Sequence, residues 1–156
     1  FILPLKAPKA RGPAPIFYGD GPDIIDETLH YLRANILFRT FSIDGPADRL
    51  LCYLTMFSTR VLGRIATCAS KTEADKAARE IAMETFLLPG EASFVLGGML
   101  FPPKDSAERE LIRSYFSQCR QELAERLVAL CFPDGTPNKW WLGYSKRKFL
   151  NTTMTK

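Results

Sequence analysis

The chain has 156 residues, of which 46% are hydrophobic and 24% charged. This composition is that of a globular domain with one core, and it excludes a chain too polar to fold. The net charge of +4 is unevenly distributed, because residues 135–156 hold five bases and no acid. The first 134 residues therefore carry 16 bases against 17 acids. A positive excess confined to one end indicates a binding partner more than a property of the fold.

Four cysteines lie inside helical patterns, and none of them forms a C-x-x-C pair. They are Cys52, Cys68, Cys119 and Cys131. A thiol in such a position packs as a small hydrophobic side chain. We therefore expect buried, reduced thiols in a cytoplasmic protein; the alternative is two disulfides in a secreted one.

Residues 1–22 are predicted to form an extended N-terminal arm. Five of the eleven prolines lie here, and proline removes a backbone donor and fixes φ. The arm is nevertheless too apolar for a solvated linker, because it begins with Phe1, Ile2 and Leu3. It is expected to lie either across its own domain or on a neighbouring subunit, and the sequence favours neither.

Residues 47–68 are predicted to form the central helix of the fold. One side carries apolar residues every three or four positions, and the other side is apolar as well. The first side consists of Leu50, Leu54, Phe57, Val61, Leu62 and Ile65, and the second of Cys52, Tyr53 and Met56. No charge stands between Arg49 and Arg60. Such a helix is stable in water only when other elements cover it, and it is shorter than the roughly 18 apolar residues of a membrane span.

Four further helices are predicted in the helical domain, residues 23–156. They are expected at about 22–41, 71–88, 105–131 and 139–150. Ser70 with Glu73 is typical of a capping box, and Asp105 with Glu108 of an N-cap. The apolar side of the fourth predicted helix consists of Leu111, Ile112, Tyr115, Cys119, Leu123, Leu127 and Leu130. The predicted fold is all-α: a single-domain helical bundle in which one central helix is surrounded by the others, with an extended N-terminal arm.

Residues 91–104 interrupt the helical pattern. Two short apolar runs flank Gly97 and Gly98 there. They are compatible with a small hairpin or with an apolar loop laid over the helices.

The sequence offers little for catalysis. Its one histidine, His30, stands on a predicted helix without the partners that a zinc or iron site needs, and we interpret it as a surface or half-buried residue. Gly97 and Gly98 lack the context of a phosphate-binding loop. No cofactor or metal is expected, and the chain is predicted not to be an enzyme.

The segment 139–150 combines both tryptophans with a basic cluster. Trp140, Trp141, Lys146, Arg147 and Lys148 are therefore predicted to contact a partner, because aromatic and basic side chains are enriched where proteins bind. The alternative is that the aromatic residues dock a terminal helix whose bases are merely solvated. Three classes of partner are compatible with the pattern: nucleic acid, an anionic membrane surface and an acidic protein surface.

Several stretches together resemble one family. They are LPLK, GPAP, DIIDETLHYLRANILFRTFSI, ADRLLCYLT, LPGEASF, RSYFSQCRQELAERL and KWWLGYSKRKFLN. In this order they resemble subunit 3 of the actin-related protein 2/3 complex, the assembly that nucleates branched actin filaments. The resemblance spans nearly the whole chain.

This resemblance implies a non-catalytic structural subunit in the cytoplasm and the actin cytoskeleton. Members of the family lie against actin-related protein 3 and close to the mother filament, while ATP is bound by the two actin-related subunits. Because actin surfaces are acidic, Lys146, Arg147 and Lys148 are expected to lie toward actin or an actin-related subunit. Phe1, Ile2 and Leu3 are the other predicted partner contacts. Neither nucleic acid nor membrane is expected as a partner; the alternative is a free-standing helical adaptor that binds one of them through its basic C-terminal helix.

Overall fold

Helices account for most of the fold in a computed structural model, which describes residues 2–7, 12–37, 42–150 and 152–155. Among these residues there are five α-helices, followed by one 3-10 helix, and no sheet. The helices are α1 (Ile24–Leu37), α2 (Pro46–Ile65), α3 (Lys71–Met83), α4 (Ser106–Cys131), α5 (Lys139–Leu142) and the 3-10 helix η1 (Gly143–Lys146). The all-α class predicted from the sequence is therefore confirmed.

Helix α2 contacts α1, α3, α4, α5 and η1. Its residues 52–58 are all buried, as the absence of charge in this stretch predicted. Two of the three hydroxyls in this stretch are satisfied within the helix, because Thr55 donates to the carbonyl of Leu51 and Ser58 to that of Leu54, each at 2.8 Å. The third, the buried hydroxyl of Tyr53, has no hydrogen-bond partner among the described residues. At the helix start, the Asp48 carboxylate accepts the backbone N–H of Gly45 at 2.8 Å. The middle of α2 is therefore buried on every side of the helix, while its two ends are partly exposed.

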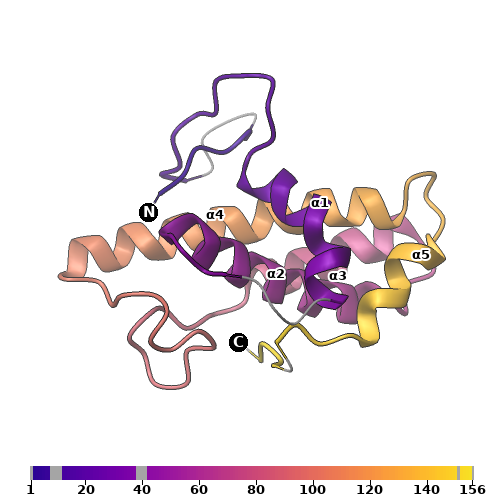
Figure 1. Ribbon diagram of the computed structural model, residues 1–156. Coiled ribbons are helices and arrows are strands. Elements are labelled where there is room, and N and C mark those ends of the chain that lie inside the picture. Colours follow the sequence, from indigo (N-terminus) through magenta and orange to yellow (C-terminus); the bar gives the residue numbers. More distant parts are fainter. Residues whose placement is uncertain (1, 8–11, 38–41, 151, 156) are drawn as a thin grey trace.

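The long helix α4 extends across the molecule, with the loop 84–105 at its beginning and α5 near its end (Figure 1). As predicted, the Asp105 side chain caps it by accepting the N–H of Glu108 at 2.8 Å. Two of its predicted core positions are wrong, because Leu111 is 42% and Leu130 39% exposed. Each directly precedes a buried residue, Ile112 and Cys131 respectively, and one residue is a turn of about 100° around a helix.

Helix α3 ends at Met83, earlier than the predicted stop at residues 88–90. Residues 91–100 then form successive turns, in which each of the N–H groups of Phe94, Gly97 and Met99 donates to the carbonyl three residues earlier. The hairpin alternative is therefore wrong, and the alternative of an apolar loop is confirmed. Phe94 and Leu100 are buried, and the Phe94 ring stacks on Tyr53 of α2 with centroids 6.2 Å apart.

The predicted C-terminal helix 139–150 is also wrong in its extent. Helix α5 has four residues, η1 has four more, and the backbone is extended at Arg147. Gly143 ends α5 and is the first residue of η1, and helices this short have little stability of their own. The chain instead turns back, because Phe149 and Met154 are buried in the core. Asn138 caps α5, because its side-chain oxygen accepts the N–H of Trp140 at 3.0 Å.

All four cysteines are free and buried. Burial raises the pKa of Cys52 to about 11 and the pKa values of Cys119 and Cys131 to about 12. These thiols are therefore protonated at neutral pH, and they pack as small hydrophobic side chains.

Candidate partner-binding surface

The N-terminal segment is hydrogen-bonded to its own chain. Leu5 donates to the carbonyl of Pro15 at 3.0 Å and accepts from Phe17 at 3.1 Å, which closes the segment into a loop. The Tyr115 hydroxyl of α4 accepts the N–H of Leu3 at 3.0 Å and donates to its carbonyl at 3.2 Å. In Figure 1 this loop stands on one side of the helices and the C-terminal segment on the other.

The three N-terminal residues predicted to contact a partner have different positions in the structure. Phe1 lies outside the described residues. Ile2 and Leu3 are half-buried and pack against the core of this chain. Part of each of these two side chains therefore remains accessible to another protein.

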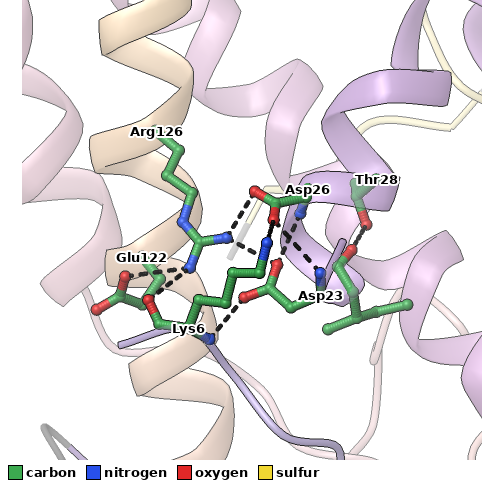
Figure 2. Close-up of polar contacts among 7 residues, drawn as sticks. Lys6, Asp23, Asp26, Thr28, Glu122 and Arg126 are labelled. Carbon is green, nitrogen blue, oxygen red and sulfur yellow. Dashed lines mark hydrogen bonds and ion pairs between the residues drawn. The ribbon is translucent and has the colours of Figure 1, made fainter. Parts of the chain in front are cut away.

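A charged cluster ties the N-terminal segment, α1 and α4 together (Figure 2). Nη1 of Arg126 donates to the carboxylates of Asp23 at 2.7 Å and Asp26 at 2.9 Å, and Nη2 donates to the carbonyl of Lys6 at 3.2 Å. Lys6 adds an ion pair to Asp26 at 3.1 Å. Glu122, one turn earlier on α4, adds an ion pair to Arg126 at 3.6 Å. The structure thus uses these charges to join its own segments.

The pKa of Asp23 depends on this cluster. Burial alone would raise it, but the hydrogen bonds from Arg126 and from the backbone amides of Lys6 and Asp26 hold the pKa below its ordinary value. The same contacts raise the pKa of Arg126 in spite of its burial. No local sequence pattern indicates Arg126 as the partner of these two carboxylates, because it is a hundred residues from Asp26 in the sequence.

The C-terminal basic surface is defined here as Trp140, Trp141, Lys146, Arg147 and Lys148. The Trp140 side chain is 82% exposed. The three bases are also exposed, whereas Trp141 is half-buried and lies 5.3 Å from the guanidinium of Arg33 on α1. The two tryptophans therefore differ in role: Trp141 helps to dock α5 on the helices, and Trp140 is presented to solvent.

The structure brings the three bases to the rim of one depression of about 250 Å³. The depression lies between the last turns of α2 and the C-terminal segment, and its lining contains no acidic residue. It is lined by Thr59, Arg60, Gly63, Ser145, Lys146, Arg147, Lys148, Thr152, Thr153 and Met154. Sequence reasoning missed Arg60 as a member of this surface; its only signal was its position as the first charge after the apolar stretch of α2.

Arg60 is held in place by an ion pair to Glu84, which follows α3. That pair uses Nη2, and Nη1 of Arg60 is buried without a hydrogen-bond partner among the described residues. Arg60 thus adds a fourth basic residue to the lining of the depression, with Lys146, Arg147 and Lys148.

No three His, Cys, Asp or Glu side chains in the part of the chain that the structure describes are placed to hold a metal ion. His30 is exposed on α1, with its ring at 4.7 Å from that of Tyr31, as expected for a surface residue. None of the helices of the described residues is long and apolar enough to cross a membrane.

An all-α fold with an exposed basic and aromatic surface is typical of proteins that act by binding other proteins. The model of the P21-Arc family, the ARP2/3 complex ARPC3 (21 kDa) subunit, matches residues 1–154. The chain belongs to this family, subunit 3 of the actin-related protein 2/3 complex. It is a structural subunit of that complex and not an enzyme, and its partners include other subunits of the complex.

Curated relatives agree with this assignment. The chain is 44% identical over 155 residues to actin-related protein 2/3 complex subunit 3 of Dictyostelium discoideum and 40% identical over 154 residues to that of Arabidopsis thaliana. Each of these matches covers 98% of this chain and 88% of the relative. The subunit of Saccharomyces cerevisiae is 37% identical over 158 residues. The family resemblance noted in the sequence is therefore confirmed.

Proposed function

We propose that this subunit contributes to nucleation and branching of actin filaments by protein–protein contacts with actin-related protein 3 and with the mother filament. It performs this role in the cytoplasm, at the actin cytoskeleton. The C-terminal basic surface is the contact we assign to an acidic actin or actin-related surface. The exposed parts of Ile2 and Leu3 are a second, apolar contact, to which we assign Phe1 from the sequence.

The single observation that supports this proposal is the clustering of Lys146, Arg147 and Lys148 beside Arg60, with no acidic residue in the depression between them. A concentrated positive surface steers and orients an acidic partner without any need for chemistry. Trp140, which is 82% exposed, adds an aromatic anchor of the kind enriched at binding hot spots.

The alternative is a free-standing adaptor for nucleic acid or acidic membrane. A membrane surface is bound through several apolar side chains next to the bases, but Phe149 and Met154, which follow the cluster, are both buried, and Leu150 between them is 39% exposed. Binding along a nucleic acid takes several separate phosphate contacts, whereas these bases surround one small depression. An acidic protein surface is therefore favoured.

The test is charge reversal in the assembled complex. The triple variant Lys146→Glu, Arg147→Glu, Lys148→Glu should assemble normally but form about tenfold fewer branches at low salt, because three exposed charge pairs together contribute on the order of 1–2 kcal/mol. Raising the salt concentration should reduce the difference between variant and wild type.

A matched control changes the net charge equally at another place. The variant Lys76→Glu, Arg79→Glu, Lys104→Glu reverses three exposed bases outside the C-terminal basic surface, and branching should stay close to that of wild type. Normal branching by a fully assembled complex carrying the Lys146, Arg147 and Lys148 reversals would overturn the proposal.

A further inference from the structure

We infer that the depression between α2 and the C-terminal segment is a binding site for a phosphoryl group. This inference goes beyond the contact with actin proposed above, because it assigns a small anionic ligand to a concave site. Three segments form the walls: Thr59, Arg60 and Gly63 of α2, residues 145–148, and residues 152–154.

The charge of the lining matches a phosphoryl group. Four cationic side chains lie around about 250 Å³, and the lining residues include no carboxylate. Glu84 neutralises part of Arg60 from outside this lining, through Nη2 alone. Lys146, Arg147 and Lys148 have no such acid in the lining. A phosphate monoester carries a charge of about −1.5 to −2 at neutral pH, which these bases can balance.

The hydrogen-bond donors of the lining exceed what a single carboxylate can accept. Ser145 and Thr153 add hydroxyl groups to the four bases, whereas the Thr152 hydroxyl donates to the carbonyl of Leu150 at 3.1 Å. A phosphoryl group offers three strongly accepting oxygens, and a carboxylate offers two. The number of donors around one small volume therefore favours the phosphoryl group.

Gly63 allows a test that leaves the charge unchanged. A Cβ at this position would have its nearest contact at 4.0 Å, the carbonyl oxygen of Ser145, so a side chain fits the backbone and projects from the wall of the depression. Gly63→Leu should therefore fill the site while it retains all four bases. Gly143→Leu is the matched control, since nothing lies within 4 Å of a Cβ there and Gly143 does not line the depression.

The measurement is calorimetric titration of the full chain with inorganic pyrophosphate, and with succinate as a dicarboxylate of similar size. We expect pyrophosphate to bind about tenfold more tightly than succinate, a difference of about 1.4 kcal/mol. Gly63→Leu should abolish this binding, as should the charge-removing variant Lys146→Gln, Arg147→Gln, Lys148→Gln. Gly143→Leu, and the variant Lys76→Gln, Arg79→Gln, Lys104→Gln, should bind as wild type does.

Three results would overturn the site. The first is that succinate binds as tightly as pyrophosphate. The second is that Gly63→Leu binds pyrophosphate as tightly as wild type does. The third is that the control variants lose as much affinity for pyrophosphate as the variants of the depression. The readout is separate from branching, so a failure here leaves the actin contact untouched, and the reverse also holds.

A second titration distinguishes the source of the phosphoryl group. A phosphoserine peptide that binds about tenfold more tightly than pyrophosphate, and more tightly than its unphosphorylated form, would assign the site to a phosphorylated protein segment. A phosphoserine peptide that binds no more tightly than pyrophosphate would assign the site to a free phosphorylated molecule. Binding to anionic vesicles without binding of pyrophosphate would contradict the site itself.

Discussion

The carboxylate of Asp23 is buried at the start of α1, where it accepts hydrogen bonds from Arg126 at 2.7 Å and from the backbone amides of Lys6 and Asp26 at 2.8 and 2.9 Å. Each of the three donors belongs to a different element: α4, the N-terminal segment and α1. One side chain therefore joins three parts of the chain, and its charged form is the one that these contacts stabilise.

This arrangement predicts how stability depends on pH. The folded state lowers the pKa of Asp23 below its ordinary 3.8, so its contribution is complete above that value and is lost as the pH falls through the folded pKa. The substitution Asp23→Asn should lower the free energy of unfolding at neutral pH by about 1–3 kcal/mol, because the hydrogen bonds to a charged group are lost. The substitution should also make the free energy of unfolding depend less strongly on pH in the acid range. Urea unfolding of wild type and variant between neutral and acid pH measures both effects.

The control for this prediction is Asp20→Asn, because Asp20 is exposed. Its unfolding free energy should stay within about 0.5 kcal/mol of wild type. An Asp23→Asn variant that loses stability on acidification as steeply as wild type would show that the cluster does not depend on the charge of this carboxylate.

Arg120 is a second residue whose role depends on the tertiary structure alone. It is completely buried, its guanidinium lies 4.5 Å from the ring centroids of both Phe57 and Phe86, and Nη2 donates to the carbonyl of Ile81 at 2.7 Å. The aromatic rings and the carbonyl at the end of α3 thus replace water around the cation. No spacing in the sequence distinguished Arg120 from an arginine on a solvated face.

At the scale of elements, α2 is the part of the fold that the others cover. Leu54 and Phe57 in its middle are fully buried, and α1, α3 and α4 all contact the helix. Any charge placed at these positions would lie in the core without a partner.

Leu54→Asp should therefore unfold the domain. An unpaired buried charge costs several kcal/mol, which is comparable to the whole stability of about 5–15 kcal/mol. Leu111→Asp makes the same chemical change on α4, at a side chain that is 42% exposed, and should remain folded. Circular dichroism during thermal unfolding measures both variants. A Leu54→Asp variant that melts as wild type does would show that α2 is not the core of the fold.

The comparison of these elements with the sequence shows what local pattern can predict. Helix α2 and the N-caps Ser70 and Asp105 were predictable, because periodicity and capping act over a few residues. The residues at which α3 and the last predicted helix end were not predictable from the sequence. Phe86, Phe149 and Met154 lie beyond these ends, where the chain leaves the helical path and buries them in the core. Tertiary burial outweighs helix propensity at these positions.

In the candidate site, too, the features that depend on neighbouring residues were predictable and those that depend on tertiary structure were not. Lys146, Arg147 and Lys148 stood together in the sequence and were predicted as one surface, and the structure places them around one depression. The contribution of Arg60 arises only where α2 meets the C-terminal segment, so no motif could indicate it. The concave shape of the site likewise depends on the return of the chain at Phe149, which the predicted continuous helix did not contain.

At the scale of the whole molecule, the positive excess of the sequence lies in its last 22 residues, and the rest of the chain is close to neutral. The C-terminal segment lies on the side of the helices opposite the N-terminal loop (Figure 1). Charge is thus concentrated on one side of a helical core, while the charged cluster around Arg126 holds the other side together. Such a distribution suits a subunit that contacts different partners on different sides.

The salt dependence of filament binding by the assembled complex tests this account most directly. The affinity for preformed actin filaments should be measured between about 0.01 and 0.15 M ionic strength, over which the Debye length falls from about 30 to 8 Å. The account predicts that affinity falls with salt for the wild-type complex and falls less steeply for Lys146→Gln, Arg147→Gln, Lys148→Gln, with weaker binding at low salt. Equal affinities and equal slopes for the two complexes would contradict it.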